Sequence, residues 1–291
     1  MAYEVPNLIQ VPIEGTTQKK WVLLVGINPG APLGGSATQY FIGDFDGRRF
    51  KADDAVNRWM EFGKDAYAME TYNDLPDNVL PTQSVIAITW VGNWQYAQQV
   101  PTSPWRSAQS VARYLTLRQT TSDGLILVQQ PISLVGLHDR QLFNGPAQIS
   151  DSAPLNISLQ HNTSFEFETT VSADAKQQLN IDVRNRKGEK LTIGYDWNAQ
   201  QLYVNRGDTR GFVNPFFTND VSTFIAPTNG QIKLHAPLDR SVLELYVNDG
   251  ERVSTTVYFM EDPASELRLS AVNGTVTVQN LSAFSMKSIW R

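Results

Sequence analysis

A glutamate near the start of the chain is the first residue whose type could do chemistry. Glu4 stands in "AYEVPNLIQVP", between an aromatic and an apolar residue and two positions before Pro6. A carboxyl group in such a setting can serve as a general acid and base. It can equally be a surface charge on an edge strand, and the local pattern by itself favours that second interpretation.

Other candidates come from short polar motifs. Asp44 and Asp46 in "GDFDG" fit a hairpin turn, because Asp-Gly is a turn signal in its own right. Two further motifs contain polar and aromatic side chains, Lys64 and Asp65 in "FGKDAY" and Asn93 and Trp94 in "GNWQY". For each of these side chains the structural alternative is an ordinary hydrogen bond or a packed ring.

The composition excludes several classes of function. The 291 residues carry a net charge of −5 with a pI near 5.3, so there is no basic field for nucleic acid or anionic lipid. There are 0 cysteines and 3 histidines, scattered at 138, 161 and 235, which argues against a metal site. No apolar run reaches the roughly 18–20 residues of a membrane span. We therefore expect no metal, no cofactor, and neither a nucleic acid nor a membrane as partner.

The elements that must position these side chains are strands. Segments rich in β-branched and aromatic residues recur every 8–12 residues or so, separated by Gly, Pro and Asn-Asp turns, which is typical of an all-β propeller, barrel or sandwich. Examples are "KWVLLVGI" (20–27), "TQYFIGDF" (38–45), "SVIAITWV" (84–91), "SFEFETTV" (164–171), "KLTIGYD" (190–196) and "SVLELYVND" (241–249).

The composition of the chain changes along its length. Residues 1–118 are dense in Trp, Tyr, Gly and Pro, whereas residues 140–291 form a regular series of alternating strands. We expect a first domain over 1–118, a linker over 119–139 and a β-sandwich over 140–291. Trp and Gly crowded onto loops suit a sugar-binding face, since flat rings stack on sugars and glycine allows close approach.

Several motifs in order resemble those of glycoside hydrolase family 32, which contains yeast invertases, inulinases and levanases. They are "INPGAPLGGSATQYFIGDFDGRRF", "FGKDAYAMETY", "WVGNWQYAQQVPTSPWRSAQSVARYLTL" and "SVLELYVNDGERVSTTVYF". The resemblance runs from Tyr3 to the C-terminus. It implies a five-bladed β-propeller followed by a β-sandwich, and retaining hydrolysis of terminal β-D-fructofuranosides such as sucrose.

The resemblance also assigns roles to the candidates. "YEVP" aligns with the Glu-Cys-Pro motif of the family, which makes Glu4 the general acid/base, with Val5 in the place of the usual cysteine. Lys64 and Asp65 match a pair near the substrate mouth, and Asn93 and Trp94 are expected to line the same rim.

Two family motifs are not found in this sequence. One is the Trp-Met-Asn-Asp-Pro-like motif with the nucleophilic aspartate, and the other is the Arg-Asp-Pro motif that stabilises the transition state. The chain resembles roughly the C-terminal half of an invertase, so we expect a partial propeller that lacks the nucleophile and is inactive alone. An opened propeller would expose strand edges.

Three hypotheses stay open from sequence. The chain is part of an invertase-like hydrolase, an inactive remnant whose sandwich serves oligomerisation or weak carbohydrate binding, or an unrelated all-β lectin, which the motif series disfavours. We expect fructose-containing sugars as ligands and a homo-oligomer formed through the sandwich.

The family implies secretion, whereas a true start at Met1 without a signal peptide would leave the protein in the cytoplasm. Four glycosylation sequons begin at Asn156, Asn162, Asn273 and Asn280.

Overall fold

The chain folds into two compact units of antiparallel sheets. The computed structural model describes residues 2–72, 85–160 and 163–290. One unit comprises Met1–Ile132 with Gly250–Ser254, and the other comprises Ser133–Asp249 with Thr255–Arg291. Apart from one short 3₁₀ turn, η1 (Val135–Leu137), the regular elements of the described residues are strands, which confirms the predicted all-β class.

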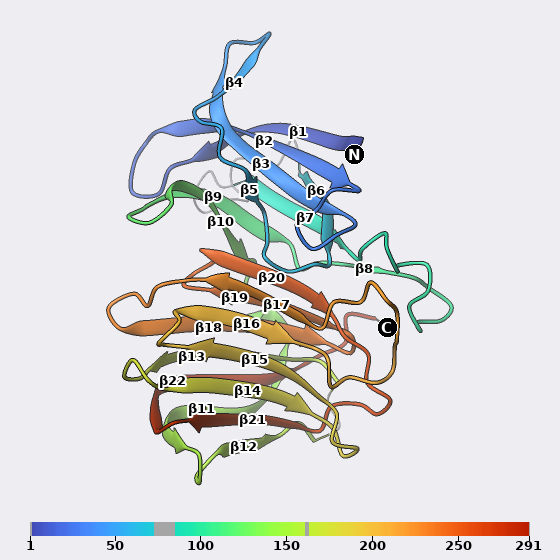
Figure 1. Cartoon of the computed structure of the whole chain (residues 1–291), viewed down its shortest axis with the longest axis vertical. Coiled ribbons are helices and arrows are strands. Elements are labelled where there is room, and N and C mark those ends of the chain that lie inside the picture. Colours follow the sequence, from blue (N-terminus) through green and yellow to red (C-terminus); the bar gives the residue numbers. More distant parts are fainter. Residues whose placement is uncertain (1, 73–84, 161–162, 291) are drawn as a thin grey trace. The chain divides into compact units, whose positions relative to one another are not determined.

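The first unit contains two five-stranded sheets (Figure 1). In the first sheet the order is β1-β2-β3-β4, with β5 beside β3, and in the second it is β10-β9-β7-β6, with β8 beside β7. Small antiparallel sheets of this kind are the blades from which propellers are built. The strands are β1 (Ala2–Pro12), β2 (Lys19–Asn28), β3 (Ala37–Phe45), β4 (Phe50–Ala52), β5 (Arg58–Trp59), β6 (Ala66–Thr71), β7 (Val85–Val91), β8 (Ala108–Gln109), β9 (Arg113–Thr120) and β10 (Gly124–Pro131).

One apolar cluster joins the two sheets of the first unit. In β9, every second residue from Arg113 to Leu117 is buried, as expected of a strand that turns one face to a core. Each fully buried aliphatic side chain contributes about 1.5–3 kcal/mol. The cluster consists of Val11, Val22, Leu24, Tyr40, Ile42, Met60, Met69, Ala87, Leu115, Leu117 and Leu127.

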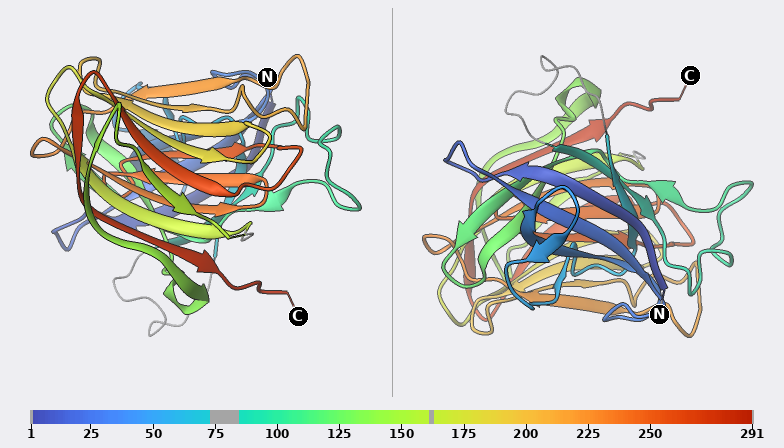
Figure 2. Two further views of the ribbon diagram at one scale, coloured as in Figure 1. Left: turned by 90° about the horizontal axis from the view of Figure 1, so that it is seen from below. Right: turned by 90° about the horizontal axis from the view of Figure 1, so that it is seen from above.

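The second unit is a sandwich of two six-stranded sheets, whose strands are seen from two further directions in Figure 2. One sheet has the order β11-β22-β13-β18-β19-β20, and the other has the order β12-β21-β14-β15-β16-β17. The strands are β11 (His138–Ser150), β12 (Leu155–Ser158), β13 (Phe165–Ser172), β14 (Gln178–Arg184), β15 (Lys190–Asp196), β16 (Gln201–Asn205), β17 (Asp220–Phe224), β18 (Gln231–Asp239), β19 (Val242–Val247), β20 (Arg252–Val257), β21 (Glu266–Val272) and β22 (Thr275–Met286).

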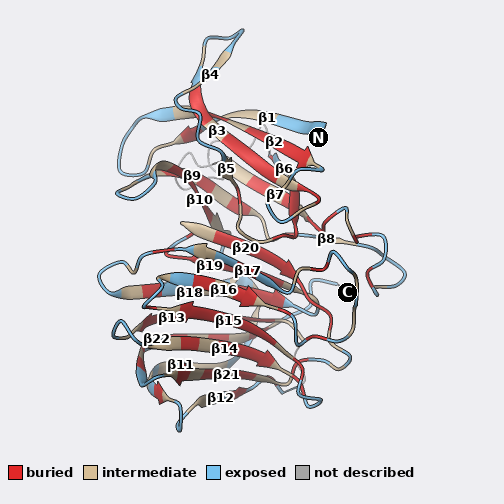
Figure 3. Cartoon of the chain, in the orientation of Figure 1, coloured by how far each residue is buried: buried red, intermediate tan, exposed pale blue. Residues whose placement is uncertain are grey.

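The core of the sandwich lies along the central strands of both sheets. Buried residues dominate β13, β14 and β15 (Figure 3). Phe165 and Phe167 on β13 are fully buried, as are Leu179 and Ile181 on β14. Apolar and polar residues alternate along β13 and β15, and this local period of two explains why the sequence predicted these two strands.

The segment between the two regions of different composition is mostly regular secondary structure. Residues 119–139, expected as a linker, include the whole of β10, which pairs with β9 over its full length. They also include η1 and the first residues of β11. The regular strands of the sandwich series begin at His138.

Candidate active site

The glutamate singled out by the sequence lies on β1 beside a β-bulge. Glu4 is exposed and pairs with Gly26 of β2. The register shifts between Glu4 and Asn7, and Val5 within that shift has φ +42°. A β-branched residue in the left-handed region is strained by about 1–3 kcal/mol, and such strain and such bulges concentrate at functional sites.

A tyrosine from the other sheet of the unit holds that carboxylate. The Tyr67 hydroxyl donates a hydrogen bond to Glu4 Oε2, while Glu4 Oε1 makes no hydrogen bond within the described part of the chain. Tyr67 lies on β6 next to a second bulge, where Ala68 has φ +52°. Burial and then the hydrogen bond to Glu4 raise the pKa of Tyr67, so the phenol stays protonated and donates at neutral pH.

The backbone beneath this pair has little room for a side chain. A Cβ atom at Gly26 would lie 3.0 Å from the Tyr67 hydroxyl and 3.1 Å from the backbone oxygen of Glu4. Both neighbours belong to the Glu4–Tyr67 pair, so any larger residue at this position would displace it. Glycine is therefore part of how β2 supports the site.

A row of aromatic rings extends from Tyr67. Its ring meets Trp90 of β7 edge to face, with centroids 6.3 Å apart and an interplanar angle of 74°. Trp90 in turn lies against Trp94, with centroids 5.0 Å apart and an angle of 33°. Trp94 ends the row and is 47% exposed. An exposed indole in a row that leads back to a fixed carboxylate is suited to stack on a sugar.

Asn93 fastens the loop that carries Trp94. Its side-chain nitrogen donates to the backbone oxygens of Lys64 (3.0 Å), Gly34 (3.3 Å) and Ser36 (3.3 Å). Its side-chain oxygen accepts from the Gln95 backbone N–H at 3.0 Å. Because Asn93 is fully buried and its amide serves backbone groups, this geometry makes it a support for Trp94.

Lys64 and Asp65 lie below the same loop. Asp65 is fully buried and accepts a hydrogen bond from the Tyr96 hydroxyl, and the Lys64 ammonium lies 5.6 Å from the centre of the Tyr96 ring. Lys64 is 5% exposed. Both side chains are thus tied to Tyr96, and direct contact with a sugar stays a prediction for each.

Of the two aspartates expected at the hairpin turn, Asp46 lies in the turn, whereas Asp44 lies on β3. Asp46 accepts the backbone N–H groups of Arg48 and Arg49 at 2.8 and 2.7 Å and so closes the turn between β3 and β4. Asp44 forms an exposed ion pair with Lys20 at 3.0 Å.

Sequence reasoning did not single out Tyr67 or Trp90 as site residues. Both stand inside motifs that it used, "FGKDAYAMETY" and "WVGNWQY". Only the tertiary structure reveals that they connect Glu4 to Trp94, through the Tyr67–Glu4 hydrogen bond between two sheets and the ring contacts of Trp90. Of the four sequon asparagines, Asn156, Asn273 and Asn280 are exposed, and Asn162 lies outside the described residues.

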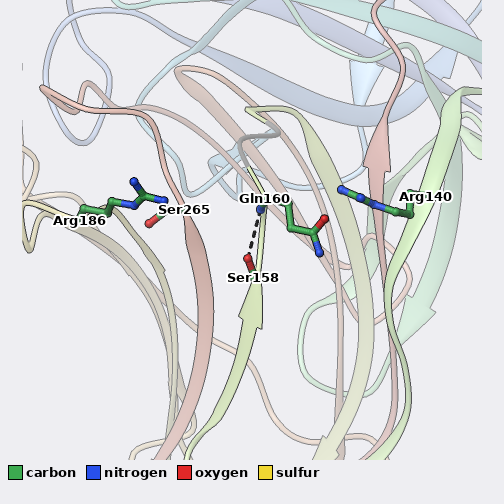
Figure 4. A pocket seen from close by; sticks show the side chains of 5 residues that line it. All are labelled: Arg140, Ser158, Gln160, Arg186 and Ser265. Atoms are coloured by element: carbon green, nitrogen blue, oxygen red, sulfur yellow. Dashed lines mark hydrogen bonds between the residues drawn. The ribbon is translucent and has the colours of Figure 1, made fainter.

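A polar cavity of about 410 Å³ occurs in the sandwich (Figure 4). Arg140 and Arg186 reach it from different elements, and Ser158, Gln160 and Ser265 complete its lining. These groups can hydrogen-bond hydroxyls or anions. The described residues that line it carry no aromatic ring, unlike the row formed by Tyr67, Trp90 and Trp94.

In the described part of the chain, no helix has the length and apolarity to cross a membrane.

Two family models together match nearly the whole chain. The "Glycosyl hydrolases family 32 N-terminal domain" matches residues 1–131, and the "Glycosyl hydrolases family 32 C terminal" model matches residues 138–285. Among curated relatives, an invertase of Debaryomyces hansenii is 37% identical over 307 residues, covering 96% of this chain and 56% of the relative. An extracellular exo-inulinase of Meyerozyma guilliermondii is 38% identical over 275 residues, covering 89% and 52%.

Solved structures agree with these relatives. A fructofuranosidase of Schwanniomyces occidentalis complexed with fructosylnystose matches with a TM-score of 0.88 at 29% identity, covering 98% of this chain and 60% of that one. An exo-inulinase of Aspergillus awamori matches with a TM-score of 0.89 at 30% identity, covering 99% and 57%.

The fold and the carboxylate beside aromatic rings define a glycoside hydrolase architecture, that of a β-propeller followed by a β-sandwich. The chain belongs to glycoside hydrolase family 32. It spans about half the length of the curated relatives it matches. The predicted family and architecture are confirmed.

Proposed function

We propose that this chain carries the acid/base side of a retaining β-fructofuranosidase site. Glu4 protonates the glycosidic oxygen of a terminal fructoside and afterwards takes a proton from the incoming water. The observation that supports this best is the Glu4 carboxylate held by Tyr67 between two bulges, at the end of an aromatic row.

Each neighbour has a part in this proposal. Tyr67 orients the Glu4 carboxylate through Oε2 and leaves Oε1 to the substrate. Trp94 stacks on a sugar ring, and Asn93 holds the Trp94 loop in place. Lys64 and Asp65 shape the same rim and bind sugar hydroxyls where the substrate reaches them.

Retention also requires a nucleophilic carboxylate about 5–5.5 Å from the acid/base. The aspartate motif that supplies it in the family is not found among the 291 residues. We therefore expect the chain to bind fructosides and to hydrolyse them only when residues from outside this sequence supply the nucleophile.

The test combines turnover and binding. The purified chain, Glu4→Gln, Trp94→Ala and Trp105→Ala are compared for glucose release from sucrose and for calorimetric binding of a fructo-oligosaccharide. Trp105 is a matched control because it is also an exposed tryptophan, with 63% of its surface accessible. We expect no glucose release, saturable binding, a roughly tenfold loss of affinity in Trp94→Ala, corresponding to about 1.4 kcal/mol, and unchanged affinity in Trp105→Ala.

Each other outcome has a definite meaning. Glucose release by the wild type that disappears in Glu4→Gln would support the acid/base role of Glu4. It would also contradict our expectation that this chain lacks a nucleophile. Turnover that persists in Glu4→Gln would contradict the role of Glu4. Absence of binding by a folded chain would overturn the site.

A second candidate is carbohydrate binding by the sandwich without catalysis. The polar cavity at Arg140 and Arg186 favours it, since its groups bond hydroxyls. It predicts oligosaccharide binding that survives Trp94→Ala and falls in Arg186→Ala.

We also propose that the protein is secreted and self-associates through the sandwich. The exposed Asn156 and Asn273 sequons and the extracellular relative support secretion. The exposed Phe224 on β17, an edge strand, supports association. Enzymatic removal of N-linked glycans from the natural protein tests secretion. Light scattering tests self-association.

A further inference from the structure

Two of the three histidines of the chain meet at one carboxylate in the sandwich. His235 on β18 places Nε2 at 2.6 Å from Glu166 Oε1. His138 on β11 contacts the other oxygen, Oε2, through its own Nε2. Glu166 itself lies on β13, so three strands that are distant in sequence converge here. The scattered histidines had predicted no such cluster.

The strand order explains this convergence. In the order β11-β22-β13-β18, Glu166 pairs with Phe284 of β22, and Glu168 pairs with His235. Glu166 and Glu168 share one face because strand side chains alternate, while Phe165 and Phe167 point into the core. The His138 ring stacks flat on Phe284, with centroids 4.2 Å apart, which fixes its orientation.

The distances suit a divalent cation. One ligand atom from each of Glu166, Glu168 and His235 lies within 4.8 Å of the other two. His235 Nε2 and Glu168 Oε1 are 3.5 Å apart. Tetrahedral Zn²⁺ with bonds of about 2.0–2.2 Å places its donor atoms roughly 3.3–3.6 Å apart. A small widening of the His235–Glu166 contact would therefore admit the ion.

We propose that Glu166, Glu168 and His235 bind a zinc-type divalent cation, with water completing the coordination. One imidazole with two carboxylates suits Zn²⁺ better than Ca²⁺, which takes six to eight oxygen ligands. His138 is a positioning residue that donates its Nε2–H to the second oxygen of Glu166. Such hydrogen bonds to ligating groups orient metal sites.

The cluster is open enough for an ion to enter. The Glu168 side chain is 62% exposed and that of His235 is 23% exposed, whereas that of Glu166 is 6% exposed. The ion would thus approach past Glu168 and meet a carboxylate that is already held from its other side. In the absence of metal, the same groups form a hydrogen-bonded histidine–carboxylate network.

Zinc binding by the whole chain, measured after dialysis against EDTA, tests the proposal. Isothermal titration with Zn²⁺ is run on the wild type, Glu168→Gln, His235→Gln, His138→Gln and the control Glu266→Gln. Glu266 is a partly exposed carboxylate on β21 of the other sheet. Absorbance of Co²⁺ bound in place of Zn²⁺ reports a tetrahedral site independently of any activity.

We expect one Zn²⁺ per chain and unchanged affinity in Glu266→Gln. His138→Gln should bind about tenfold more weakly, as expected for a group that orients a ligand, and the two ligand variants more weakly still. No stoichiometric binding, or full affinity in Glu168→Gln, would overturn the proposal. If His235→Gln fails to fold, Glu168→Gln still decides, because that side chain is mostly solvent-exposed.

Discussion

Glu4 and Tyr67 are the smallest unit that carries the proposed chemistry. The exposed carboxylate of Glu4, on the edge strand β1, is held by the phenol of Tyr67. A general acid/base must be held within hydrogen-bonding distance of the atom with which it exchanges a proton. For this role the position of the Glu4 carboxylate, fixed by Tyr67, matters more than its charge. Tyr67 is 3% exposed and is in turn fixed by Trp90.

Tyr67→Phe should remove the hydroxyl while keeping the ring in place. We expect the free energy of unfolding to fall by about 1 kcal/mol, the usual net value of one hydrogen bond. Denaturation in urea measures this change. The matched control is Tyr3→Phe, beside Glu4 and 70% exposed, which should stay within about 0.5 kcal/mol of the wild type. Equal effects of the two substitutions would show that the Glu4–Tyr67 bond contributes nothing.

At the scale of elements, loops without regular structure are held by buried polar side chains. The Asn93 side chain holds the loop that carries Trp94. Gly35, which has φ +71°, leaves room for the Asn93 amide because it has no side chain. A Cβ atom at Gly35 would lie 2.0 Å from Asn93 Oδ1.

Gly35→Ala should therefore destabilise the first unit strongly. We expect a loss of at least about 2 kcal/mol, from the left-handed backbone and from displacement of Asn93. Gly136→Ala is the control, since nothing lies within 4 Å of its added carbon. Thermal melts followed by Trp fluorescence compare the two, and a Gly35→Ala variant as stable as Gly136→Ala would contradict the proposed role of the loop.

Glu189 plays the corresponding part in the sandwich, between β14 and β15. It is fully buried and accepts the backbone N–H groups of Arg210 at 2.7 Å and Glu261 at 3.0 Å, and a hydrogen bond from the Asn185 side chain. Burial alone would raise the pKa of Glu189, but these hydrogen bonds lower it below the ordinary value of 4.5.

The lowered pKa of Glu189 predicts a pH-dependent contribution to stability. A carboxyl with a folded-state pKa below its unfolded value stabilises the fold above about pH 4.5, and this contribution is lost as the pH falls through the folded pKa. Glu189→Ala should cost about 3 kcal/mol at pH 7 and progressively less toward pH 3. Urea denaturation over this range measures it, with the exposed Asp208→Ala as control; a cost independent of pH would contradict the assignment.

At the scale of the whole molecule, the sandwich has a core of its own. Its two sheets contribute fully buried side chains from both inner faces, among them Phe165, Ile181, Leu191 and Leu245. A span of about 160 residues is an ordinary domain size. We expect this core to be sufficient for folding.

Residues 133–291, expressed alone, should fold. We expect a strand-type circular dichroism spectrum, a cooperative thermal transition and resistance to proteolysis. A broad transition with binding of a hydrophobic dye would instead indicate loosely packed sheets and contradict the independence of the sandwich.

The sequence by itself was sufficient for the all-β class, the family and the candidate glutamate, although β10 lies in the segment expected as a linker. Strand formation depends on β-branched residues, alternation and turns, all of which are local. "GDFDG" was predicted as a turn for that reason, and Asp46 closes it. The motif series likewise lies along the chain and needs no folding to be recognised.

Only the tertiary structure decided which side chains meet. Tyr67 reaches Glu4, and two distant histidines reach Glu166, because strands far apart in sequence are brought together in the fold. Val5 and Ala68, beside Glu4 and Tyr67, both have positive φ at bulges, although neither residue type favours that conformation. Strand pairing is a non-local interaction, and no spacing in the sequence encodes which partner a side chain will find across a sheet.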